Sequence, residues 1–88
     1  MKYHVEFTAS AQKQLRKMDK ANAALITGWI RKNLEGCTDP RQHGKGLTAN
    51  RSGQWRYRVG DYRILARIED GKVLILVLSI GHRSEIYS

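Results

Sequence analysis

The 88-residue chain has little of what secreted, cross-linked or membrane-bound proteins need. Its one cysteine, Cys37, allows neither an internal disulfide nor a cysteine metal cluster, and its one proline, Pro40, does not fit a disordered composition. No apolar run approaches the roughly 18 residues that cross a bilayer, and the N-terminal MKYHVEF lacks a secretion-signal pattern. These absences predict one domain over residues 1–88, in a reducing cytoplasm and away from membranes.

Acidic residues are also scarce, since eight Asp and Glu stand against sixteen Lys and Arg, for a net charge of +8. Phosphate backbones are the commonest partners of such a balance, because binding releases condensed counterions. An acidic protein partner, an anionic membrane surface or a merely solvated basic face fits the same composition. Among these interpretations the charge favours nucleic acid.

Hydrophobic periodicity predicts an α+β fold, in the order strand, helical hairpin and three strands. Residues 3–7 alternate as a half-buried strand, Thr8 or Ser10 can cap a first helix, and Asp19 ends that helix and caps the second. The second helix ends near Gly36. Its apolar stripe is Leu25, Ile26, Trp29, Ile30 and Leu34. We expect one twisted sheet of about four strands with the hairpin on one face.

Residues 37–53 are expected to form a long connecting loop, because they hold three glycines and the proline. Three strands follow, at residues 55–59, 62–69 and 72–80. Gly60-Asp61 predicts a two-residue turn of type II′, and Asp70-Gly71 predicts one of type I′.

Counting outward from two-residue turns predicts which residues share a face of the sheet. Arg58 then lies opposite Arg63 across the first turn. Across the second turn the pairs are Glu69 with Lys72, Arg67 with Leu74, and Arg63 with Leu78. One face collects apolar residues and should carry the helices: Trp55, Tyr57, Val59, Tyr62, Ile64, Ala66, Ile68, Val73, Ile75 and Val77.

The opposite face collects arginines and leucines: Arg56, Arg58, Arg63, Arg67, Leu65, Leu74, Leu76 and Leu78. Opposed arginines destabilise a hairpin, so the pair makes sense where an anion sits between the two guanidiniums. Arginine suits phosphate because its planar fork donates two parallel hydrogen bonds. Long side chains that splay into solvent are the alternative. The leucines, with Arg67, predict an exposed apolar strip of the kind that binds a protein partner.

The tail GHRSEIY places His82, Arg83 and Tyr87 close together, and only His82 has an ordinary pKa near neutrality. A hydrophobic plug at Tyr87 and a plain surface histidine are the alternatives. His4 and His43 have no third ligand, so neither a metal site nor a cofactor is expected. Further candidate RNA contacts, or solvated cations, are Lys45 in the loop and Arg16, Lys17, Arg31 and Lys32 on the helices.

The patterns WRYRVGDYRI and ILVLSIGHRSEIY, with the DP…GKGL element at Asp39–Leu47, resemble the RelE/ParE superfamily of bacterial toxin–antitoxin toxins, in particular its RelE branch. The resemblance covers nearly the whole chain. It implies a metal-independent endoribonuclease that acts on mRNA in the ribosomal A site. There the ribose 2′-OH attacks the adjacent phosphate and leaves a 2′,3′-cyclic phosphate and a 5′-hydroxyl.

The resemblance also implies roles for individual residues. Arg56 and Arg58 would position the phosphate, Arg63 would stabilise the developing charge, and Tyr87 would accept the 2′-OH proton. The general acid is His82 or Arg83, and matching of pKa to operating pH favours His82.

The same resemblance implies partners: an acidic antitoxin over the arginine–leucine face, the ribosome with its mRNA, and operator DNA only through the antitoxin. The alternatives are a ParE-like toxin that inhibits DNA gyrase and a catalytically decayed module that binds nucleic acid or acts as a co-repressor.

Overall fold

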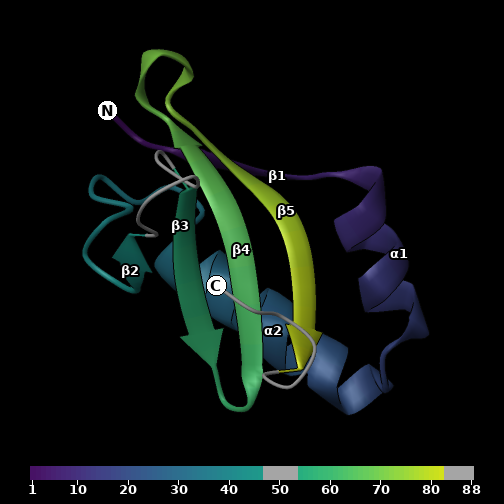
Figure 1. The fold of residues 1–88 in the computed structure, drawn as a ribbon. Helices are drawn as coiled ribbons and strands as arrows, with labels where there is room; N and C mark the ends of the chain where they lie inside the picture. The colour runs from purple at the N-terminus through teal and green to yellow at the C-terminus, as the bar shows by residue number, and fades with distance from the viewer. Residues whose placement is uncertain (47–53, 83–88) are drawn as a thin grey trace.

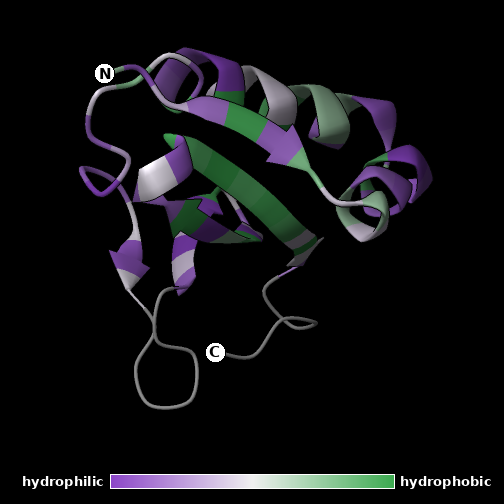
Figure 2. Ribbon diagram, turned by 90° about the horizontal axis from the view of Figure 1, so that it is seen from above, coloured by the Kyte–Doolittle hydropathy of each residue, from purple (hydrophilic) through white to green (hydrophobic). Residues whose placement is uncertain are grey.

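The computed structural model describes residues 1–46 and 54–82, which form two helices and one sheet (Figure 1). The sheet has five strands in the order β1-β5-β4-β3-β2. Both helices lie on the same side of it (Figure 2). This arrangement confirms the predicted α+β class and the helical hairpin on one face. The elements are β1 (His4–Phe7), α1 (Ala9–Lys17), α2 (Lys20–Asn33), β2 (Lys45–Gly46), β3 (Gln54–Val59), β4 (Tyr62–Glu69) and β5 (Leu74–His82).

Thr8, one of the two predicted candidates, caps α1, and Asp19 caps α2 as predicted. The hydroxyl of Thr8 accepts a hydrogen bond from the backbone N–H of Ala11, and the carboxylate of Asp19 accepts one from Ala21. Each bond satisfies a backbone donor that the first turn of a helix leaves open. Asp19 therefore separates two helices that would otherwise run on as one.

One edge of the sheet is closed by β1 and α1 together. β1 runs parallel to the first half of β5, and α1 then lies beside the second half (Figure 1). The hydroxyl of Thr8 donates to the carbonyl oxygen of Leu78 at 2.9 Å, and the side-chain oxygen of Gln14 accepts from the N–H of Ile80 at 2.6 Å. These side chains satisfy backbone groups that an open edge would leave to a foreign strand.

The core lies between the sheet and the helices, and it contains most of the predicted residues. From the strands it holds Val5, Tyr57, Val59, Ile64, Ala66, Ile68, Ile75, Val77 and Ile80, and from the helices Ala11, Ile26 and Ile30, with Leu34, the C-cap of α2. Trp55 and Tyr62 lie at its margin and are half-buried. Leu25 departs from the prediction, because 53% of it is exposed on α2. Its position is one residue off the stripe that Ile26 and Ile30 bury.

The first hairpin has the predicted register and the second does not. Arg58 pairs with Arg63 across the Gly60-Asp61 turn, where Gly60 has the positive φ of 59° that a type II′ turn requires. The second connection is a 3-10 turn over Asp70–Lys72, followed by Val73 at a φ of 51°. Val73 is therefore in the loop and not in a strand. The third strand begins at Leu74 instead of Lys72.

The wider turn moves β5 by two residues, so Glu69 pairs with Leu74 and Arg67 with Leu76. A shift of two leaves each side chain on its predicted face. A bulge then interrupts the pairing, since Ala66 pairs with Val77 but Leu65 pairs with Ser79. The extra residue is Leu78, and beyond it the faces of β5 are exchanged. Arg63 consequently lies opposite Gly81 and not opposite Leu78.

Candidate functional site

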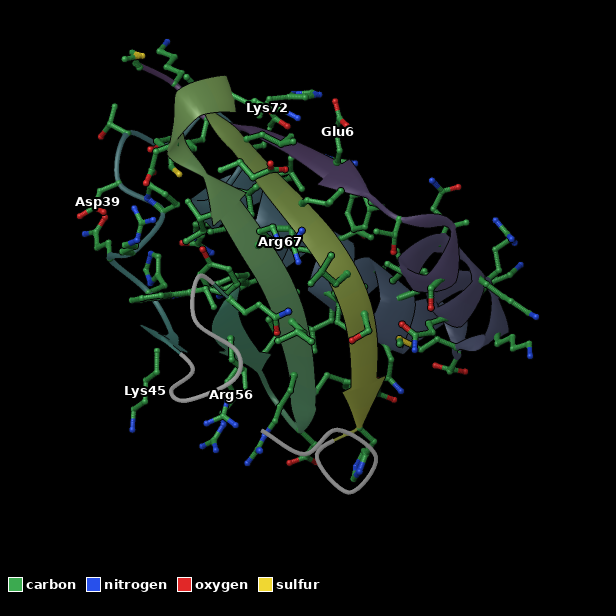
Figure 3. The ribbon with its side chains drawn as sticks, turned by 45° about the horizontal axis from the view of Figure 1, so that its top comes forward. Glu6, Asp39, Lys45, Arg56, Arg67 and Lys72 are labelled. Atoms are coloured by element: carbon green, nitrogen blue, oxygen red, sulfur yellow. The ribbon has the colours of Figure 1, made fainter. Side chains whose placement is uncertain are left out.

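The face of the sheet without helices carries a group of four neighbouring cations, Lys45, Arg56, Arg58 and Arg63, which we call the basic face. They come from β2, β3 and β4. Lys45 pairs with Arg56, and Arg58 pairs with Arg63. Paired residues project to one side of a sheet, so the four side chains lie together. Figure 3 shows Lys45 and Arg56 extending side by side from this end of the sheet.

The Arg58–Arg63 pair sits in a row that supplies no carboxylate. Gly81 completes this row on β5, and Leu65 and Ser79 complete the row of Arg56. Arg58 is exposed and Arg63 is half-buried. Two like charges in direct opposition weaken a strand pair. The arrangement is therefore unfavourable for folding alone and favourable for holding an anion between the two strands.

A hollow of about 270 Å³ lies beside this pair, lined by Gly44, Lys45, Arg56, Tyr57 and Arg58. Of these five described residues, three are cationic and the other two carry no charge. A phosphate group in the hollow can accept hydrogen bonds from both β2 and β3. This geometry makes the basic face a candidate phosphate-binding site.

The short strand β2 was missed by the sequence prediction, which assigned residues 37–53 to a loop. Gly44 makes the strand possible, because its φ is +78° and a Cβ there would collide with the carbonyl oxygen of Arg56. The indole N–H of Trp55 donates to the carbonyl oxygen of His43 at 2.6 Å. The only available signal was the pair of glycines around Lys45, which permits close backbone approach.

The loop before β2 is fixed at two more points. The buried hydroxyl of Tyr57 donates to the carbonyl oxygen of Pro40 at 2.6 Å, and burial raises the pKa of Tyr57. The guanidinium of Arg41 donates two hydrogen bonds, of 3.0 and 2.9 Å, to the carboxylate of Asp70. These bonds, with a further one from Tyr3, hold the pKa of Asp70 below its ordinary value. The loop that presents Lys45 is therefore tied to the core and to the β4–β5 turn.

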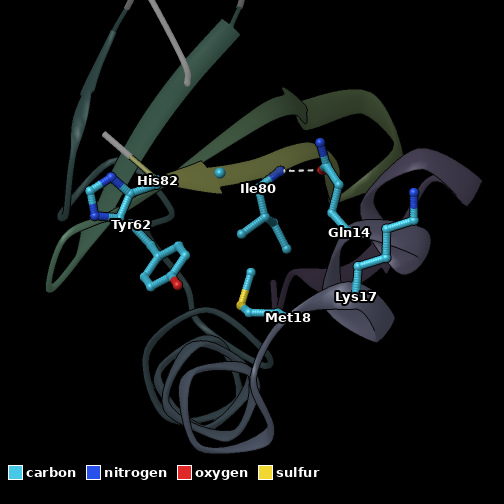
Figure 4. A pocket seen from close by; sticks show the side chains of 7 residues that line it. Gln14, Lys17, Met18, Tyr62, Ile80 and His82 are labelled. Atoms are coloured by element: carbon cyan, nitrogen blue, oxygen red, sulfur yellow. Dashed lines mark hydrogen bonds between the residues drawn. The ribbon is translucent and has the colours of Figure 1, made fainter. Parts of the chain in front are cut away.

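The structure does not bring His82 to the basic face. His82 pairs with Tyr62, and the two rings meet edge to face with centroids 5.6 Å apart (Figure 4). Tyr62 faces the helices, so His82 does as well. The bulge at Leu78 causes this, because without it His82 would project to the side of Arg63. Arg83 and Tyr87 lie outside the described residues, as does Leu47.

The predicted apolar strip is half-buried rather than fully exposed. Its four leucines, Leu65, Leu74, Leu76 and Leu78, all have intermediate exposure. Leu76 lies between Arg67 on β4 and Glu6 on β1, and long charged side chains can cover apolar neighbours with their stems. Figure 3 shows Arg67 on the helix-free face. The strip is thus interleaved with charge and not a continuous apolar patch.

The helix cations occupy other parts of the molecule. Arg16 and Lys17 are in the last turn of α1, and Arg31 and Lys32 are in the last turn of α2. Cations at these positions complement the negative end of the helix dipole, which gives them a structural role. In the described part of the chain, no three His, Cys, Asp or Glu side chains cluster as metal ligands, and no helix is long and apolar enough to cross a membrane.

A family model described as the ParE toxin of type II toxin–antitoxin systems matches residues 5–87. The chain belongs to the RelE/ParE superfamily of toxins. Toxin RelG of Mycobacterium tuberculosis is 32% identical over 87 residues, which span 99% of this chain and 98% of that relative. Toxin RelE of the same organism is 32% identical over 85 residues, which span 97% of this chain and 86% of the relative.

Solved structures of RelE/ParE toxins share the fold. A chain of the M. tuberculosis toxin–antitoxin complex RelBE2 superimposes with a TM-score of 0.84 at 29% identity, over 97% of this chain and 95% of that one. A chain of the archaeal RelE–RelB complex of Pyrococcus horikoshii gives a TM-score of 0.72 at 25% identity, over 98% and 100%. The chain is therefore a toxin of a toxin–antitoxin system, built on the RelE-like fold.

Proposed function

We propose that this toxin is a ribosome-dependent, metal-independent endoribonuclease that cleaves mRNA in the A site, in the cytoplasm. The observation that carries the proposal is the basic face, where Arg58 opposes Arg63 beside a hollow lined by Lys45 and Arg56. Relatives named RelE and RelG add support.

The proposed reaction is a transesterification within the RNA. The ribose 2′-oxygen attacks the adjacent phosphorus, the bond from phosphorus to the 5′-oxygen breaks, and the products carry a 2′,3′-cyclic phosphate and a 5′-hydroxyl. Arg56 and Arg58 position the phosphate by donating hydrogen bonds to its oxygens, while Arg63 stabilises the charge that develops on these oxygens. Lys45 holds the neighbouring backbone. Tyr87 accepts the 2′-OH proton, and clustered cations favour the ionised phenol that this role needs.

The general acid gives its proton to the departing 5′-oxygen, and the place of His82 in the fold argues against His82 for this step. His82 faces the helices, across the sheet from Arg58 and Arg63. A general acid must lie within hydrogen-bond reach of the atom that it protonates. The departing alkoxide is a stronger base than a neutral guanidine, so an arginine can protonate it. We therefore assign proton donation to Arg83.

An antitoxin is the second partner in the proposal. Toxins similar to this chain were crystallised in complexes named RelBE2 and RelE–RelB. We propose a RelB-like segment that lays carboxylates against Arg67 and the basic face, and apolar side chains against Leu65, Leu74 and Leu76. Such a segment neutralises the toxin by occupying the phosphate-binding hollow.

A cell-free translation reaction tests the function. The chain is added to a defined message, and the 5′ ends of all mRNA fragments are mapped. Cuts confined to ribosome-occupied codons support the proposal. The family model is described by the ParE name, so gyrase inhibition is the rival function. A supercoiling assay run in parallel with DNA gyrase would reveal it as loss of supercoiling with intact mRNA.

A further inference from the structure

The helix side of the sheet carries a pocket that the proposed reaction does not use. It opens between α1 and the ends of β4 and β5, with a volume of about 390 Å³ (Figure 4). Ligand pockets commonly measure roughly 300–1,000 Å³, so this one is large enough for a small polar ligand. Its lining includes Gln14, Lys17, Met18, Tyr62, Ile80 and His82.

The walls of the pocket combine three kinds of surface. Met18 and Ile80 are apolar, the rings of Tyr62 and His82 are aromatic, and Gln14 and Lys17 are polar (Figure 4). None of the lining residues that the structure describes carries a carboxylate. A ligand that fits has a flat or apolar body and an anionic group. An aliphatic peptide side chain would offer no hydrogen-bond acceptor to the side-chain NH₂ group of Gln14 or to the ammonium of Lys17.

Three of these side chains are held in place before any ligand arrives. Gln14 accepts a hydrogen bond from the N–H of Ile80 at 2.6 Å, and the hydroxyl of Tyr62 accepts one from Asn22 on α2 at 3.1 Å. Tyr62 and His82 fix each other by edge-to-face contact at 5.6 Å. These side chains are therefore preorganised, which lowers the entropy that binding a ligand would cost.

We propose that this pocket binds one unstacked RNA nucleotide, with the base against Tyr62, His82 and Met18 and the phosphate at Lys17. Proteins that bind single-stranded RNA pair aromatic or apolar side chains with cations in this way. The inference rests on the proposed RNA substrate. The pocket and the basic face lie on opposite sides of the sheet, so the bound nucleotide is not the one that is cleaved.

Titration of the isotope-labelled toxin with single nucleoside monophosphates, followed by NMR, tests the pocket without ribosomes. We expect saturable shifts at the backbone amides of Gln14, Met18 and Ile80. Inorganic phosphate is the control for charge alone, and it should shift amides of the basic face while leaving these three unchanged. Nucleotides that leave the pocket amides unmoved, or phosphate that moves them equally, would overturn the proposal.

Charge variants on α1 provide the matched comparison. Lys17→Glu should weaken nucleotide binding at the pocket about tenfold or more, the loss expected for one charge-assisted contact. Lys13→Glu makes the same charge change on an exposed residue outside the lining, and it should leave the affinity nearly unchanged. Met18→Trp should block binding by filling the space. If both glutamate variants lose the same affinity, nucleotides are attracted by long-range electrostatics and do not bind in the pocket.

Titration with a trinucleotide tests whether the natural ligand of the pocket is RNA or a free mononucleotide. We expect it to shift the same amides at lower concentration than a mononucleotide, and weaker binding would refute the assignment to RNA. Because the titration contains no ribosome, its outcome is independent of cleavage. If the toxin cuts mRNA but nucleotides do not shift the pocket amides, only the proposed nucleotide pocket is refuted. If nucleotides shift the pocket amides but the toxin does not cut mRNA, only the proposed endonuclease activity is refuted.

Discussion

Arg58 lies directly opposite Arg63 in the antiparallel pair β3–β4, so two guanidiniums share one row of the sheet. The next row places Lys45 beside Arg56. A chain selected only to fold would separate these charges or insert a carboxylate between them. Lys45, Arg56 and Arg58 line one hollow, which makes the helix-free face a candidate site for a phosphate group.

Removing one arginine of the Arg58–Arg63 pair should raise the stability of the protein and lower its affinity for RNA. Arg58→Gln relieves the cross-strand repulsion, so we expect the free energy of unfolding to rise by roughly 0.2–1 kcal/mol. RNA affinity should fall, because a phosphate contact is lost. Urea denaturation and RNA binding at two salt concentrations measure both effects. Lys13→Gln, at an exposed lysine in the middle of α1, removes the same charge away from the basic face and should change neither by as much. An Arg58→Gln protein that is less stable and binds RNA as before would contradict the account.

Gly44 should be intolerant of a side chain, since it combines a φ of +78° with close approach to the carbonyl oxygen of Arg56. We expect Gly44→Ala to cost roughly 1–3 kcal/mol of stability and to weaken RNA binding by displacing Lys45. Gly28→Ala is the control, because apart from the neighbouring backbone of its own helix no atom lies within 4 Å of a Cβ built there. It should stabilise the protein by about 0.5–1 kcal/mol. Thermal unfolding of both variants gives the comparison, and equal effects would argue against a special conformation at Gly44.

The antitoxin surface can be tested on the same face. Leu76 is half-buried between Arg67 and Glu6, and a glutamate there would add a negative charge where an acidic antitoxin segment is proposed to bind. We expect Leu76→Glu to weaken antitoxin binding while the free toxin stays folded. Calorimetric titration with the antitoxin measures the affinity, and circular dichroism checks the fold. Leu25→Glu, at the exposed leucine of α2, is the control. Unchanged affinity in the Leu76 variant would refute this surface.

The two candidates for the general acid make opposite predictions. Arg83→Ala should slow single-turnover cleavage by about 100-fold, a typical contribution of a general acid. His82→Ala should change the rate by much less, because His82 faces the helices beside Tyr62. Rapid-quench measurement of the first cleavage event on stalled ribosomes gives both rates. A large loss for His82→Ala alone would restore histidine as the proton donor.

Local patterns were sufficient to predict the fold class, both helix caps and the first hairpin. Thr8 and Asp19 act through bonds within three residues, and a positive φ at Gly60 is a local property of the turn. The alternation of apolar and polar residues then predicted the correct face of the sheet for nearly all side chains of β3 and β4. These features depend on residues that are close in sequence.

The features that the sequence did not reveal depend on distant contacts. β2 forms because residues around Lys45 meet Trp55 and Arg56 of β3. The β4–β5 turn is wider than Asp70-Gly71 indicated, and the side chain of Asp70 is held there by Tyr3 and Arg41. The bulge at Leu78 occurs where α1 replaces β1 beside β5, with Thr8 bonded to the carbonyl oxygen of Leu78. That bulge determines the face of the sheet from which His82 projects. Counting residues outward from the turn could not predict this face.

The most direct test of the central claim uses purified ribosomes stalled with a short end-labelled mRNA. The toxin should cut the A-site codon without added metal cofactor and leave a 2′,3′-cyclic phosphate, and the same mRNA without ribosomes should stay intact. Tyr87→Phe, which keeps the ring and removes the hydroxyl, should abolish the cut while the protein stays folded. An uncut message with the unmodified toxin, or full cleavage by the Tyr87→Phe protein, would contradict the account.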